Sequence, residues 1–157
     1  MLGNEILDGT KPDEIGYLIG KDLAKEGIVP ARMSVILEED LKAEIESILS
    51  TERFDSLIIV CNFRPQKDDK ILDLISTAIG RQLLPDKELF EATGKNLLTR
   101  SEKKTPTLPD DAAIKSPNGT VQGFKIMIRH CKIYVLPKKI AELRLTLRNS
   151  VIPELRN

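Results

Sequence analysis

An uninterrupted run of apolar residues, SLIIVC at 56–61, constrains the fold of this chain more than any other feature. A run without polar alternation is typical of a strand that is buried on both faces of a parallel sheet. Segments with helical apolar spacing lie before and after it, at residues 14–26, 41–49 and 70–79. This order predicts an α/β fold, a three-layer sandwich with a mostly parallel sheet between helices.

The rest of the sequence predicts further strands and helices. Residues 31–37 (ARMSVIL) are rich in β-branched side chains and predict a strand, and Asp40 is expected to cap the helix that follows. We also expect a helix over 86–98, a long loop over 99–122, a C-terminal β-hairpin formed by 124–129 and 132–137, and a last helix over 139–152 that Pro153 ends.

The start of the sequence leaves two alternatives open. GNEIL at 3–7 has the pattern of a turn and helix start that follows a strand, yet only Met1 and Leu2 stand before it. Either the first strand is truncated or the sheet begins with a ragged edge. The alternatives matter because a central parallel strand supplies apolar area to both helical layers.

Length and composition exclude several classes of protein. The 157 residues fit one domain, 1–157, and 24 basic against 24 acidic residues create no long-range field for nucleic acid or an acidic membrane. Basic residues are concentrated over 125–148, but aromatic residues make up only 4% of the chain, too few for a base-stacking platform. Two cysteines without a CxxC pair, and no apolar stretch of membrane-spanning length, predict a cytoplasmic protein with no membrane partner.

Several motifs together resemble the molybdopterin-binding-like domain family. They occur in the family's order and spacing over nearly the whole chain: GNEILDG (3–9) with Asp13, RPQKDD (64–69), LPDDA (108–112), NGTVQGF (118–124) and KIYVLP (132–137) with Glu142 and Leu143. The similarity is greatest to the amino-terminal halves of CinA proteins and of eukaryotic FAD synthases. It implies a small-molecule ligand, a nucleotide or pterin that carries phosphate, and assembly as a homo-oligomer.

The glycine-rich turn of the family is replaced in this chain. Its glycines correspond to Cys61, Asn62 and Arg64, so the backbone loses the close approach to an anion that glycine permits. Asn62 tolerates a left-handed conformation, and the guanidinium of Arg64 offers a bidentate substitute for the lost backbone donors. Asn62 and Arg64 are therefore candidate ligand-binding residues.

Four acidic residues are the candidate metal ligands. Asp68 and Asp69 follow the turn, Glu5 and Asp13 follow the neighbouring strand position, and all four match acidic positions of the family. By this resemblance they would hold a divalent metal (Mg²⁺ or similar), with Asp68 and Asp69 as the catalytic pair of a pyrophosphatase. The alternative is that Asp68, Asp69 and Asp13 only open helices, where aspartate is favoured without a metal.

A second candidate ligand site lies later in the chain. Gly119, Thr120 and Gly123 could form a small nest for a phosphate or pterin, although NG is also a common turn by itself. His130 has no second histidine beside which to bind zinc.

Two functions follow from these residues. The first is a divergent domain that binds a nucleotide or pterin and hydrolyses a dinucleotide such as ADP-ribose or FAD with a metal. The second is a catalytically inactive degenerate domain that serves in oligomerisation or regulation. The lost glycines favour the second function, and the retained acidic residues favour the first.

Overall fold

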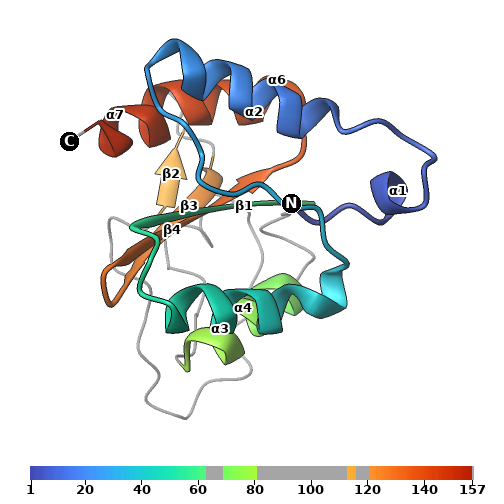
Figure 1. The fold of residues 1–157 in the computed structure, drawn as a ribbon, viewed down its shortest axis with the longest axis vertical. Coiled ribbons are helices and arrows are strands. Elements are labelled where there is room, and N and C mark those ends of the chain that lie inside the picture. The colour runs from blue at the N-terminus through green and yellow to red at the C-terminus, as the bar shows by residue number, and fades with distance from the viewer. Residues whose placement is uncertain (63–68, 81–112, 116–120, 157) are drawn as a thin grey trace.

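One four-stranded sheet organises the described part of the chain. The structure, a computed structural model, describes residues 1–62, 69–80, 113–115 and 121–156 (Figure 1). The strand order is β1-β4-β3-β2. The strands are β1 (Ser56–Cys61), β2 (Ala113–Lys115), β3 (Val121–Ile128) and β4 (Cys131–Pro137). β1 runs parallel to β4, whereas β3 is antiparallel to both β4 and β2, so β3 and β4 form the predicted C-terminal hairpin.

Helices cover both faces of the sheet (Figure 1). One layer contains α2 (Glu14–Lys25), α6 (Ile140–Thr146), the π-helical turn η3 (Leu147–Val151) and α7 (Ile152–Leu155); the other contains α3 (Leu41–Ser50) and α4 (Asp69–Ile79). Two apolar clusters lie between these layers and the sheet, one built around Ile45, Ile75 and Ile133 and the other around Val60, Leu136 and Leu143. The predicted α/β three-layer architecture is confirmed.

The helix boundaries follow local chemistry, with one exception. The carboxylate of Asp13 accepts the N–H of Gly16 and opens α2, and glycines with positive φ follow α2 and α4, Gly27 at 73° and Gly80 at 65°. Asp40 precedes α3 after the short 3₁₀ turn η1 (Glu38–Asp40), but its side chain makes no capping hydrogen bond. Asp40 therefore occupies the predicted cap position, but it does not cap the helix with its side chain.

The predicted strand at 31–37 is reduced to one bridge. Ile36 pairs in parallel with Leu2, and the N–H of Leu2 donates to the carbonyl of Val60 at 2.9 Å. Met1–Gly3 thus lie between the end of β1 and Ile36, and lead into the short helix α1 (Asn4–Leu7). Residues 31–35 do not form a strand, because their β-branched composition cannot replace a paired neighbour.

Two other expectations are corrected, and one lies outside the described residues. The predicted loop over 99–122 contains β2 at 113–115 and the first residues of β3, because a three-residue strand is too short to show alternation. Pro153 does not end the last helix but stands in α7, directly after the π-helical turn η3, where the regular α-helical hydrogen-bonding pattern is already interrupted. The helix expected over 86–98 lies outside the described residues. None of the described helices is both long and apolar enough to cross a bilayer.

Candidate functional site

Three chain segments leave the sheet at one edge, which we name the carboxyl edge and define by Gly3–Glu5, Asn62 and Lys138. Leu2 lies beside the end of β1, and Cys61 in β1 stands opposite Pro137 in β4. The backbone continues this pairing past the strands, since the N–H of Lys138 donates to the carbonyl of Cys61 at 3.0 Å. In open α/β sheets, ligands bind outside the carboxyl ends of parallel strands.

A partly buried ion pair crosses the carboxyl edge. The Nζ of Lys138 lies 2.8 Å from Oε1 of Glu5, and the side chains are 14% and 35% exposed. The hydrogen bond from Lys138 holds the pKa of Glu5 below its ordinary value, and the burial of Glu5 opposes this shift only in part. The edge therefore holds an ammonium group with limited access to water, beside a carboxylate that remains ionised.

The loop after α1 fixes the position of Glu5. Its backbone carbonyl accepts two hydrogen bonds, from the hydroxyl of Thr10 at 2.9 Å and from the N–H of Lys11 at 2.8 Å. Asp8 accepts bonds from the hydroxyl and the N–H of the same Thr10, which closes the loop on itself. Glu5 is thus held by its backbone as well as by Lys138.

Asp13 is a helix cap in this structure. Its Oδ1 accepts the N–H of Gly16 at 2.6 Å, and a Cβ at Gly16 would overlap the same carboxylate. Among the described residues, no three His, Cys, Asp or Glu side chains lie close enough together to hold a metal ion. Whether Glu5 and Asp13 share a divalent metal with Asp68 and Asp69 stays a prediction, because those two side chains lie outside the described residues.

The other predicted site residues divide into two groups. Asn62 is exposed directly after β1, at the carboxyl edge. Asp69 is the first residue of α4, but the position of its side chain lies outside the described part of the chain, as do residues Arg64, Asp68, Gly119 and Thr120. Their assignment to the site stays a prediction.

Gly123 has a structural reason to be glycine. It lies buried in β3 opposite Ile114 of β2, and a Cβ there would overlap the carbonyl oxygen of Val135 in β4. Close approach of β3 to β4 therefore requires glycine at this position whether or not a ligand binds.

Sequence reasoning did not single out Lys138. It is one of several basic residues over 125–148, most of which lie on exposed surfaces, and the sequence does not separate it from Lys139, which is 71% exposed. The available signal was position, because Lys138 directly follows an apolar strand that is parallel to β1. A polar residue at such a strand end faces the edge where ligands bind.

Comparison with known proteins identifies relatives over the whole chain. The family described as "Probable molybdopterin binding domain" matches residues 1–157. A CinA-like protein of Desulfosudis oleivorans is 27% identical over 162 residues, which cover 98% of this chain and 39% of that protein. A CinA-like protein of Syntrophus aciditrophicus is 29% identical over 161 residues, covering 97% and 38%. The chain thus spans about two fifths of the length of these curated relatives.

A solved structure has the same fold. The crystal structure of the protein CinA, with unknown function, from Thermoplasma acidophilum aligns with a TM-score of 0.69 at 25% sequence identity. The alignment covers 94% of this chain and 90% of that one. The family and the architecture expected from the sequence motifs are both confirmed.

Proposed function

Because the chain belongs to the family of probable molybdopterin binding domains, we propose that its carboxyl edge binds a small molecule that carries phosphate, a nucleotide or a pterin. The observation that carries this proposal is the position of Lys138. It places a half-desolvated ammonium group where the ends of β1 and β4 meet, 2.8 Å from Glu5. A phosphate can displace the carboxylate of Glu5 from this ammonium, since both are anions of similar hydrogen-bonding geometry.

Side chains rather than main chain bind the anion in this proposal. The family's glycine-rich turn presents backbone N–H groups, and here Asn62 stands at one of those positions, exposed beside the carboxyl edge. Its amide can donate to a phosphate oxygen, while Lys138 supplies the charge. The sequence adds Arg64 as a further cation at this turn. Gly119 and Thr120 stay candidate ligand residues from the sequence alone.

The main alternative is a domain without catalysis, retained for oligomerisation or regulation. This alternative is favoured by the contacts of Glu5 and Asp13, the two candidate metal ligands whose side chains the structure describes. Glu5 is paired with Lys138, and one oxygen of Asp13 caps α2, so both carboxylates already have partners within the chain. We therefore assign ligand binding to the carboxyl edge and assign no reaction step to a metal.

Calorimetry with matched lysine variants tests the binding. We expect ADP-ribose and FAD to bind the unmodified protein, and the Lys138→Gln variant to bind about 10- to 100-fold more weakly, the effect of losing a charged hydrogen bond. Lys139→Gln is the control, because Lys139 is exposed and pairs with Glu142 in its own helix turn. Equal affinities in both variants would rule out Lys138 as the anion-binding group.

A change at Glu5 separates direct anion binding from metal-bridged binding. If phosphate competes with Glu5 for Lys138, Glu5→Gln raises affinity, because the competing carboxylate is gone. If Glu5 is a metal ligand, the same change lowers the affinity measured with Mg²⁺ and leaves the affinity measured with EDTA unchanged.

Turnover is tested separately. The protein is incubated with ADP-ribose or FAD in the presence of Mg²⁺, Mn²⁺ or Co²⁺, beside an Asp68→Ala/Asp69→Ala variant. Hydrolysis that disappears in this variant supports the metal-dependent pyrophosphatase. Ligand binding with the same background hydrolysis in both proteins supports the inactive domain.

A further inference from the structure

The short helix α1 and the residues after it form a loop beside the carboxyl edge. We name residues 4–12 the α1 loop, and Figure 1 shows α1 to one side of the two helical layers, joined to α2 by chain without regular structure. α1 contains no buried residue, and residues 7–12 are all exposed. The apolar side chain of Leu7 is itself 51% exposed. Such a segment gains little free energy from packing against the sheet.

The backbone hydrogen bonds of the α1 loop close within the loop and its two ends. The N–H groups of Ile6 and Leu7 donate to the carbonyl of Gly3 at 3.0 and 3.1 Å. The N–H of Lys11 returns to the carbonyl of Glu5 at 2.8 Å. The loop is therefore a small folded unit whose internal hydrogen bonds are local.

One contact fastens this unit to the sheet. Among the described residues, the bond between Glu5 and Lys138 is the only hydrogen bond or ion pair from the α1 loop to a residue beyond position 14. Lys138 is held in place, because its N–H donates to the carbonyl of Cys61 at 3.0 Å. Lys138 is thus the fixed member of the pair, and Glu5 belongs to the part that can move.

The same ammonium is the group that the proposed function gives to a phosphate. Its Nζ already lies 2.8 Å from Oε1 of Glu5. A phosphate that takes the charged hydrogen bonds of Lys138 leaves the carboxylate of Glu5 to water. Phosphate binding at the carboxyl edge and fastening of the α1 loop therefore compete for one side chain.

We propose that the α1 loop is a flap that a bound phosphate group releases. The flap is closed through Glu5 and Lys138, and it opens when the phosphate takes Lys138. This inference rests on the proposed function for its ligand and on the contacts of the loop for its mechanism. Because the two equilibria are linked, a change that holds the flap closed weakens phosphate binding, and a change that opens it strengthens binding by the same factor.

Distances between two spin labels test whether the ion pair holds the flap. Both native cysteines are buried, so the labels attach to cysteines introduced at the exposed Leu7 and Leu145, of which Leu145 lies on α6. We expect one narrow distance distribution in the labelled protein. Glu5→Ala should add a second, broad population, because the ratio of closed to open flap falls about 10- to 100-fold, the effect of losing a charged hydrogen bond. Lys139→Gln is the control, since it removes an exposed pair within one helix turn.

ADP-ribose tests whether a phosphate releases the flap. Added to the labelled protein, it should produce the same broad population as Glu5→Ala. Exchanging the two charges, Glu5→Lys with Lys138→Glu, keeps an ion pair but removes the fixed cation. In this double variant the flap should stay closed and ADP-ribose should not open it, because a carboxylate at position 138 repels phosphate. Melting curves without ligand show whether each variant folds.

Thr10 tests whether the folded loop positions Glu5. Its hydroxyl lies 2.9 Å from the carbonyl oxygen of Glu5 and 2.7 Å from Oδ1 of Asp8. Thr10→Val removes these bonds, and we expect ADP-ribose to bind several-fold more tightly, because a less ordered loop holds Glu5 on Lys138 less well. Thr10→Ser keeps the hydroxyl and is the matched control. Equal affinities in the two variants would overturn the flap, in favour of an ion pair that acts alone.

The outcomes separate the flap from the proposed function. A narrow distribution that persists in Glu5→Ala would overturn the flap, independently of any ligand. Binding of ADP-ribose that depends on Lys138 in calorimetry but leaves the distribution narrow would overturn release by the ligand. Absence of calorimetric binding would overturn the proposed function and release by the ligand together, while a broad population in Glu5→Ala would still support the role of the ion pair.

Discussion

Asp22 and Arg148, 126 positions apart in the sequence, form a two-pronged ion pair that joins α2 to the π-helical turn η3. Arg148 Nη2 lies 2.9 Å from Oδ1 of Asp22, and Nε lies 3.2 Å from Oδ2. The carboxylate is buried at 3% exposure, whereas the arginine is 46% exposed. Hydrogen bonds from Arg148 hold the pKa of Asp22 below its ordinary value, against the effect of burial.

The two partners should not be equally sensitive to substitution. Arg148→Met leaves a buried carboxylate with only the more distant Arg144 and Lys25, and we expect a loss of about 3 kcal/mol in the free energy of unfolding. Asp22→Asn leaves a guanidinium that can reach water, and we expect about 1–2 kcal/mol. Urea unfolding of both variants measures this difference, and equal losses would contradict it.

Two glycines should respond in opposite directions to alanine. Gly123→Ala places a methyl group against the carbonyl of Val135, and we expect the free energy of unfolding to fall by about 1–3 kcal/mol. Gly20→Ala, in the interior of α2, meets only the sulfur of Met33 at 3.9 Å. That change should stabilise the protein by up to about 1 kcal/mol, because alanine is the better helix former. Thermal unfolding compares the two.

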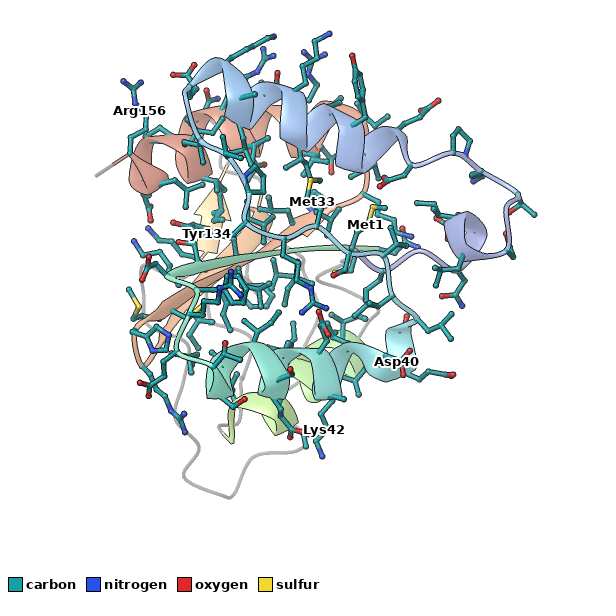
Figure 2. The ribbon with its side chains drawn as sticks, in the orientation of Figure 1. Met1, Met33, Asp40, Lys42, Tyr134 and Arg156 are labelled. Carbon is teal, nitrogen blue, oxygen red and sulfur yellow. The ribbon has the colours of Figure 1, made fainter. Side chains whose placement is uncertain are left out.

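The two aspartates that precede helices should also differ. Asp13→Ala removes the hydrogen bond to Gly16 and should cost about 0.5–2 kcal/mol, whereas Asp40→Ala removes no capping bond and should cost less than 0.5 kcal/mol. Figure 2 shows Asp40 at the start of α3. Asp13→Asn keeps a capping side chain, so a loss of ligand binding in this variant without a loss of stability would assign Asp13 a role beyond the cap.

Glu154 should control part of the acid stability. It accepts hydrogen bonds from Lys125 at 2.6 Å, Lys132 at 3.0 Å and Tyr134 at 3.1 Å, which together fasten α7 to the sheet. Burial raises the pKa of this carboxyl group, but the bonds from Lys125 and Lys132 outweigh it and leave the pKa lowered. A lowered pKa contributes stability above the unfolded value, about 4.3, that is lost as pH falls through the folded value.

The Glu154→Gln variant measures this contribution. We expect the unfolding free energy to fall by about 1–3 kcal/mol at neutral pH and the difference from the unmodified protein to shrink below about pH 4. Glu142→Gln is the control, since its pair with Lys139 is exposed and contributes about 0–1 kcal/mol. A difference that stays constant down to pH 3 would show that Glu154 stabilises the fold without its charge.

The sequence predicted the elements whose side chains carry a clear period. The apolar run at 56–61 and the hairpin near residue 130 were confirmed, because buried strands and amphipathic helices leave their spacing in the sequence. The strand predicted at 31–37 was wrong, since β-branched residues favour a strand only where a neighbouring strand is available. The sequence of residues 31–37 alone does not show whether such a neighbouring strand is present.

The sequence predicted where on the sheet the candidate site lies, but it predicted less well which residues form that site. The carboxyl ends of parallel strands follow from the fold, which brings Glu5 and Asn62 to one edge. The pairing of Glu5 with Lys138 joins residues 133 positions apart, and the sequence offers no period from which to infer it. Asp13 shows the reverse case, since its capping role follows from local sequence alone.

Both cysteines of the chain are fully buried, Cys61 at the end of β1 and Cys131 at the start of β4. Burial, with the nearby charge of Asp55, raises the pKa of the Cys131 thiol and keeps it protonated. A thiol reagent can therefore reach either sulfur only after β1 and β4 separate from the layers that cover them. The rate of cysteine labelling therefore measures how often the central sheet opens, and the measurement needs no engineered probe.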